Sequence, residues 1–98
     1  MTFANTVLAV LGVEVLTATQ VKCVVRCLQG ELVCGQRFRA VGPDGEDVPS
    51  AGPLTVAGMW RYEMAVDLVD PPHSAKVLLT GTLGEGGSGV RLLDVSEV

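Results

Sequence analysis

A strict period of two over residues 21–28 is the feature that most constrains how this chain folds. One set of alternate positions holds Val21, Cys23, Val25 and Cys27, and the other holds Lys22, Val24, Arg26 and Leu28. Successive side chains of a β-strand point to opposite faces, so this pattern predicts a strand with one buried face. Residues 37–40 repeat it, with Phe38 and Ala40 alternating with arginines. The glycines at positions 30 and 35 predict a hairpin with a bulge between these two strands.

The segment 54–69 is predicted to form one long strand, or two strands joined by a bend. Every second residue along it is uncharged, whereas its charged residues, from Arg61 onward, have the opposite parity. A helical spacing of three and four residues fits this segment less well. The alternation places Trp60 and Tyr62 on the apolar face, where we expect them to pack in the core.

The remaining chain predicts further short strands separated by turns. Strands are expected at 75–83 and 90–95, and the residues 42–53, rich in Gly, Pro and acidic side chains, are expected to form a loop. Six or seven short strands separated by turns are typical of a barrel or sandwich. We therefore expect one all-β domain covering residues 1–98.

Composition narrows the class of protein further. The chain has 98 residues, of which 48% are apolar and 18% charged, which argues against a disordered tail. No stretch approaches the ~18 uncharged apolar residues of a transmembrane helix. The first twenty residues lack the basic region of a signal peptide, and Glu14 interrupts their apolar run. We read this segment as a strand and expect a cytoplasmic protein with no membrane partner.

Residues 24–42, VVRCLQGELVCGQRFRAVG, resemble the second domain of translational GTPases such as elongation factor Tu. That family shows an Arg, a Gly four residues on, an aliphatic residue, a Gly and a hydrophobic strand. The matching positions here are Arg26, Gly30, Leu32, Gly35 and Phe38. Gly58 and the VLLTG sequence at 77–81 match the closing hairpin of the family, so the resemblance spans roughly residues 18–95. It implies a small closed six-stranded Greek-key barrel.

The departures from that family bear on function. The barrel of elongation factors follows a nucleotide-binding domain, but no phosphate-loop sequence occurs here. A Gly-rich entry before the second strand is replaced by residues 18–20, and a small residue plus Gly by residues 71–74. In elongation factors the barrel holds the aminoacylated end of tRNA and contacts the GTPase switch regions. Ser74 aligns with a polar position near that pocket. The resemblance implies the barrel for this chain, without the aminoacyl-tRNA activity.

Short motifs predict neither a cofactor nor a metal. GEGGSG at 84–89 has the Gly-x-Gly-x-x-Gly spacing, but a dinucleotide site also needs a following helix, so a turn is favoured. The acidic residues Asp44, Glu46 and Asp47 lack the spacing of a calcium loop. Three cysteines and His73 lack zinc-site spacing, so Cys23, Cys27 and Cys34 are expected to be buried thiols.

Charge is distributed unevenly along the chain. Residues 20–41 carry a net charge of +3 and the remainder −7, giving −4 overall. If residues 21–28 and 37–40 pair as a hairpin, Lys22, Arg26, Arg37 and Arg39 form a basic patch on its outer face. Such a patch either meets phosphates or an acidic protein surface, or is simply a solvated face that guards against edge pairing. No exposed aromatic residue is expected among these side chains, which disfavours an RNA site.

These observations favour a non-enzymatic binding module that recognises a protein partner, such as a separate GTPase, or self-associates. The candidate site residues are Lys22, Arg26, Arg37 and Arg39, with His73 and Ser74 at the adjoining loop. The alternative is a tRNA- or rRNA-binding accessory protein that uses the same basic patch. The weakest hypothesis is a small enzyme with a nucleophilic cysteine activated by His73.

Overall fold

The computed structural model describes residues 6–84 and 89–95, and this part of the chain contains strands and no helix. The strands are β1 (Val7–Leu16), β2 (Gln20–Gln29), β3 (Arg37–Val41), β4 (Leu54–Arg61), β5 (Met64–Ala65), β6 (Ser74–Thr80) and β7 (Arg91–Asp94). The all-β prediction is confirmed. Within the described residues no helix could cross a membrane. Most of the glycine-rich turn predicted at 84–89 lies outside the described residues.

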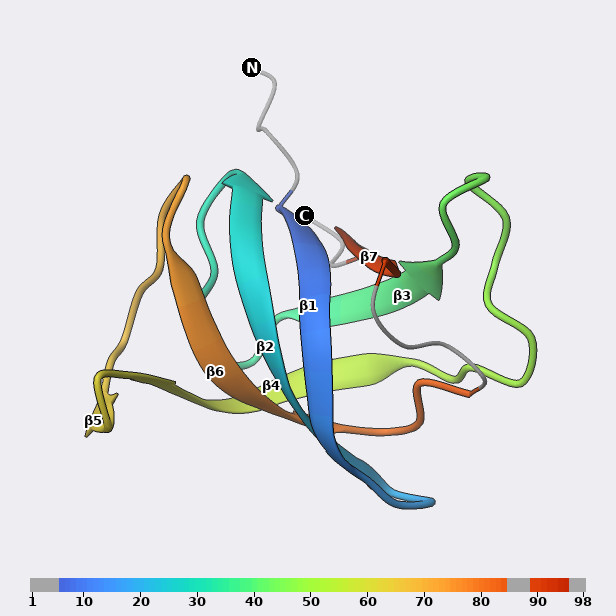
Figure 1. The fold of residues 1–98 in the computed structure, drawn as a ribbon, viewed down its shortest axis with the longest axis horizontal. Helices are drawn as coiled ribbons and strands as arrows, with labels where there is room; N and C mark the ends of the chain where they lie inside the picture. Colours follow the sequence, from blue (N-terminus) through green and yellow to red (C-terminus); the bar gives the residue numbers. More distant parts are fainter. Residues whose placement is uncertain (1–5, 85–88, 96–98) are drawn as a thin grey trace.

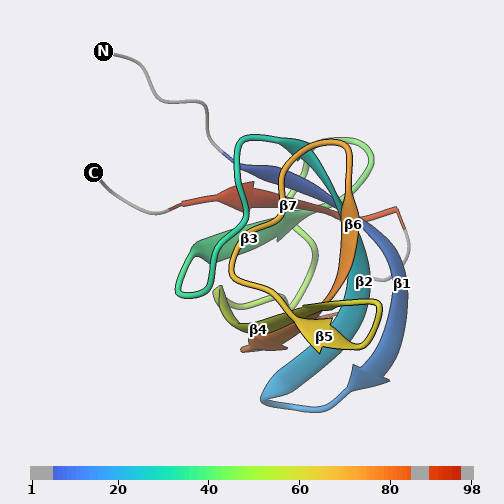
Figure 2. The same ribbon diagram turned by 90° about the vertical axis from the view of Figure 1, so that its left-hand side faces the viewer.

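The strands form one antiparallel sheet whose pairings return on themselves (Figures 1 and 2). Their order is β3-β7-β1-β2-β6-β4-β5, and β3 also pairs with β4, so the strands are arranged in a ring. The described residues form seven strands, where the family resemblance implies six. The additional strand is the two-residue β5, which continues from β4 through a tight turn.

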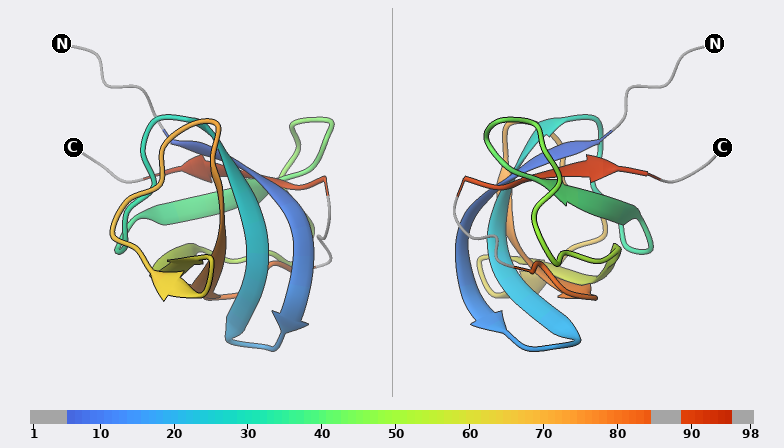
Figure 3. Two further views of the ribbon diagram at one scale, coloured as in Figure 1. Left: turned by 60° about the vertical axis from the view of Figure 1, so that its left-hand side comes forward. Right: turned by 90° about the vertical axis from the view of Figure 1, so that its right-hand side faces the viewer.

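The strands enclose an interior (Figure 3), and the predicted buried faces of β2 and β6 contribute side chains to it. All four inward residues of β2, namely Val21, Cys23, Val25 and Cys27, are completely buried. On β6 the buried residues are Ala75, Val77 and Leu79, as the alternation predicts. The N-terminal segment forms β1, which pairs with β2 along almost its whole length. Burial of these aliphatic side chains is the main stabilising contribution of the fold.

The predicted hairpin between residues 21–28 and 37–40 is wrong. β2 pairs with β1 and β6, whereas β3 pairs with β7 and β4. The connection between β2 and β3 crosses to the segment before β6, where Leu32 and Val69 exchange two backbone hydrogen bonds of 2.8 and 3.0 Å. Leu32 is fully buried there. Because Leu32 is buried at this point, the chain leaves β2, and the next strand, β3, joins the opposite side of the ring of strands.

The predicted alternation along 54–69 fails at a β-bulge in β4. Val56 lies opposite Leu79 and Gly58 opposite Leu78, so one extra residue is accommodated between them. A bulge shifts the facing of every later side chain by one position. Met59 is therefore buried and Trp60 lies on the outer face. The prediction that Trp60 and Tyr62 pack in the core is wrong.

Candidate binding groove

A groove of about 720 Å³ lies on the outer faces of β2, β6 and β4. The strand register places Trp60 opposite Lys76, and Lys76 opposite Val24, so these three side chains lie side by side across the sheet. The turn between β4 and β5 bounds the groove at one end, together with the residues leading into β6. The groove therefore has both apolar and cationic side chains in its lining. We call it the aromatic groove.

Trp60 lies along the sheet because residue 58 has no side chain. A Cβ placed on Gly58 would lie 2.7 Å from Cη2 of the indole and 3.3 Å from two further ring atoms. The ring thus rests directly against the backbone of Gly58. The ammonium of Lys22, on β2, lies 5.9 Å from the centroid of the indole ring, within the range of a cation–π contact.

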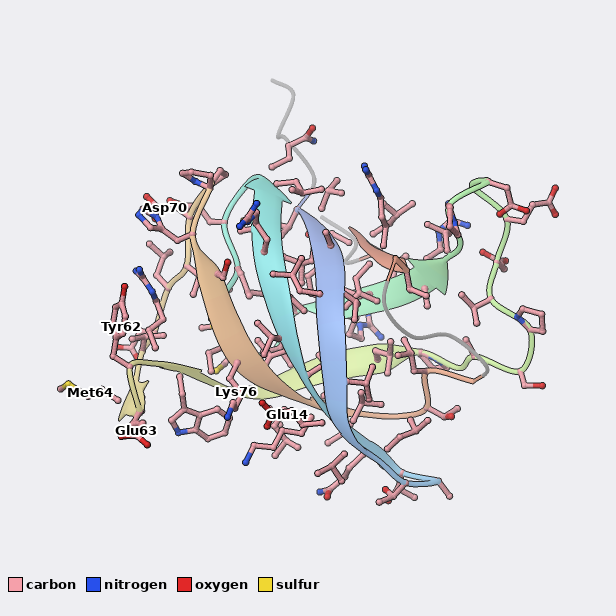
Figure 4. The ribbon with its side chains drawn as sticks, in the orientation of Figure 1. Glu14, Tyr62, Glu63, Met64, Asp70 and Lys76 are labelled. Atoms are coloured by element: carbon pink, nitrogen blue, oxygen red, sulfur yellow. The ribbon has the colours of Figure 1, made fainter. Side chains whose placement is uncertain are left out.

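The turn at the end of the groove holds two residues in the left-handed region. Tyr62 and Glu63 have φ values of 52° and 66°, which match the two-residue turns that join β-hairpins. Asn and Gly are preferred in such turns, because other side chains are strained there. Tyr62 is nevertheless 88% exposed and Met64 is 70% exposed. Both side chains point away from the ring of strands at the β4–β5 turn (Figure 4).

Two of the basic side chains near the groove lie within 4 Å of a carboxylate and two do not. Nζ of Lys76 lies 3.2 Å from Oε1 of Glu14 on β1 (Figure 4). Nδ1 of His73 lies 3.1 Å from Oδ1 of Asp70. Lys22 and Arg61 make no ion pair with any residue in 6–84 or 89–95. Arg61 instead lies 5.5 Å from the ring centroid of Tyr62.

The structure brings together only half of the site residues predicted from sequence. Lys22, His73 and Ser74 line the aromatic groove. Arg26 lies on the exposed face of β2, opposite Ser74 in the register but outside the groove lining.

The two predicted residues of β3 lie apart from the groove. Arg37 and Arg39 are separated from β2 by β7 and β1. Arg39 lines a smaller hollow of about 230 Å³ and pairs with Asp47 at 3.2 Å. The single basic patch predicted for a hairpin is therefore wrong, because β2 and β3 do not pair.

The aromatic residues of this site were not predicted from the sequence. Trp60 and Tyr62 were expected inside, and Arg61 and Lys76 were not candidates. Gly58 carried the signal, because an isolated glycine within a strand pattern often marks a bulge or a close approach. The expectation that no exposed aromatic residue lies near the cations is also wrong.

Burial makes the thiols of Cys23 and Cys27 poor nucleophiles. Burial raises the pKa of the Cys23 thiol to about 12, with a further contribution from the charge of Glu14. The pKa of Cys27 is also raised, first by burial. Thiolate formation is disfavoured at both positions. Cys34 is exposed, so its predicted burial is wrong.

The sequence also predicts an acidic loop at residues 42–53 and no metal site. Residues 42–53 lie outside the strands, and the side chain of Asp44 accepts a hydrogen bond from the backbone of Glu46 at 3.1 Å. Within the ranges that the structure describes, no group of three or more His, Cys, Asp or Glu residues could hold a metal ion.

No model of a protein family matches the chain, and no curated protein matches it.

Proposed function

We propose that the protein is a non-enzymatic binding module that recognises a protein partner through the aromatic groove and the β4–β5 turn. In this proposal the ring of strands is a closed Greek-key barrel of the kind found as the second domain of translational GTPases. A separate GTPase is one class of partner that fits this resemblance.

One observation carries the proposal, namely the exposure of Tyr62 in a left-handed turn. A bulky residue in that conformation costs stability, of order 1–3 kcal/mol, and persists where surrounding structure or function requires it. At 88% exposure, Tyr62 gains little from packing. Exposed Tyr and Trp side chains are enriched among the residues that dominate protein interfaces. Met64, exposed beside the same turn, adds an adaptable apolar contact.

The alternative, a tRNA- or rRNA-binding protein, receives less support. Its basic patch of Lys22, Arg26, Arg37 and Arg39 is divided between strands on different sides of the ring. A phosphate backbone binds strongly only where several cations act together.

Photo-crosslinking tests the proposal. A photoreactive phenylalanine replaces Tyr62 in the full chain, and the matched control carries it at Glu46, an exposed position in the loop between β3 and β4. We expect one protein to be captured from position 62 and not from position 46, and to bind the purified chain directly. Capture of RNA from position 62 would favour the alternative, and a crosslinked dimer would favour self-association. Equal capture from both positions, or none from position 62, would contradict recognition through this turn.

A further inference from the structure

We propose that the aromatic groove takes an extended peptide segment of the partner protein in which carboxylates flank an apolar or aromatic side chain. This inference rests on the proposed function and names the ligand chemistry of the same groove.

The floor of the groove has both apolar and cationic surface, so a ligand that covers it needs both apolar and anionic groups. Trp60, Lys76 and Val24 alternate apolar, cationic and apolar surface across three adjacent strands. A purely apolar ligand would remove the ammonium of Lys22, which also lines the groove, from water without giving it a carboxylate partner, which is costly. A purely anionic ligand would leave the indole and Val24 uncovered. A chain that presents both kinds of side chain satisfies the whole surface.

Two cations are held in place without being neutralised. Lys22 and Arg61 lie 5.9 and 5.5 Å from aromatic ring centroids, and neither pairs with a carboxylate within the described ranges. The aromatic rings orient these side chains but leave their full charge for an incoming anion. Arg61 also offers the planar fork of donors that matches a carboxylate in a bidentate pair.

The chain itself places one carboxylate at this surface. Glu14 reaches Lys76 from β1 at 3.2 Å, and the two side chains remain 42% and 41% exposed, respectively. Ion pairs at this exposure contribute little stability, so another carboxylate can replace Glu14 readily. The pair shows which anion geometry Lys76 accepts, and Glu14 is then a competitor of the ligand.

The acidic residues around the groove favour a peptide over a nucleic acid. Glu63 lines the groove, and Asp70 is paired with the His73 that lines it. A nucleic acid carries a phosphate at every step and would pass these carboxylates, as well as Glu14, on a protein of net charge −4. A peptide places its few carboxylates only where Lys22, Arg61 and Lys76 lie.

Selection from a phage-displayed library of random peptides on the full wild-type chain tests this inference. We expect the enriched peptides to carry Asp or Glu within two residues of an aromatic or aliphatic side chain. Their dissociation constants are then measured by fluorescence polarisation. Lys22→Met and Arg61→Met should each weaken binding roughly tenfold, in the range of an interface hot spot. The matched control, Arg91→Met on the exposed face of β7, should leave the affinity unchanged.

Two further variants make the test independent of folding. Glu14→Gln frees Lys76 and should tighten peptide binding severalfold, a gain that misfolding does not produce. Lys22→Gln should reproduce the loss in Lys22→Met, with circular dichroism verifying that both remain folded.

Several results would overturn the inference. In the selection, enrichment of neutral or basic peptides, or no enrichment at all, would contradict it. In the affinity measurements, an unchanged dissociation constant for Lys22→Met would contradict it. So would displacement of the bound peptide by single-stranded RNA at a lower concentration than by unlabelled peptide. If crosslinking from position 62 still captures a protein, the proposed function survives while the acidic-peptide chemistry fails. If that capture also fails, both fail.

Discussion

The indole of Trp60 rests against the backbone of Gly58, so closely that a Cβ on Gly58 would lie 2.7 Å from Cη2 of the ring. The same glycine follows the extra residue of the bulge in β4. The bulge turns Trp60 to the outer face, and the missing side chain lets its ring lie along the sheet. Together they create the apolar wall of the aromatic groove.

Gly58→Ala should displace Trp60 without unfolding the protein. The added methyl group meets only a side chain that can swing away, so we expect the free energy of unfolding to fall by about 1 kcal/mol. The chain contains one Trp, so its fluorescence reports this residue alone. Acrylamide should quench the variant more strongly than the wild type. Gly12→Ala is the control, because nothing lies within 4 Å of its Cβ. Equal quenching in both variants would contradict this contact.

Met59→Ala should destabilise the protein more than Trp60→Ala, although tryptophan is the larger residue. Met59 is 2% exposed, and removal of a buried Met side chain costs about 2–5 kcal/mol. Trp60 lies on the outer face, so its truncation should cost about 1 kcal/mol. Urea denaturation of the two variants measures the difference. The reverse order would mean that uninterrupted alternation, with Trp60 inside, describes β4 correctly.

These contacts explain how far the sequence predicts the fold and the groove. Alternation correctly identified the buried faces of β2 and β6, because both strands are regular and each buries one face. It failed after Val56, because a single bulge inverts the facings in the rest of β4, and the only sign of that bulge in the sequence is a glycine. The pairing of β3 was also missed, since local patterns do not state which strands are neighbours. Lys22, His73 and Ser74 were found as charged or polar side chains, whereas Trp60 was hidden by the inverted facing.

Glu63→Gly should stabilise the protein. Glycine adopts the left-handed conformation without the steric penalty of other residues, which is about 1–2 kcal/mol. We expect the free energy of unfolding to rise by about 1 kcal/mol in urea denaturation. Asp67→Gly is a matched control, since Asp67 is exposed and is not among the residues with positive φ. It should lower stability through the added freedom of the unfolded chain. A similar loss in both variants would argue against strain in the turn.

Stability should fall at alkaline pH through Cys23. Its pKa is about 12 in the folded protein against a reference value of 9.0. Below about pH 9 both states keep the thiol proton, whereas between about pH 9 and 12 only the unfolded state loses it, which favours unfolding. Cys23→Ala should therefore show a shallower decline of unfolding free energy over this range than the wild type. The raised pKa of Cys27 acts in the same direction. Equal slopes in Cys23→Ala and the wild type would contradict the prediction.

Recognition through the aromatic groove is tested most directly by titrating the chain with the partner captured at position 62. The measurement combines Trp60 fluorescence with backbone amide NMR shifts. We predict a saturable change in the Trp60 signal, with shifted amides at Lys22, Val24 and Ser74 around the groove. Saturation of the partner with an unchanged Trp60 signal, and with amide shifts confined to Arg37 and Arg39 on β3, would contradict it.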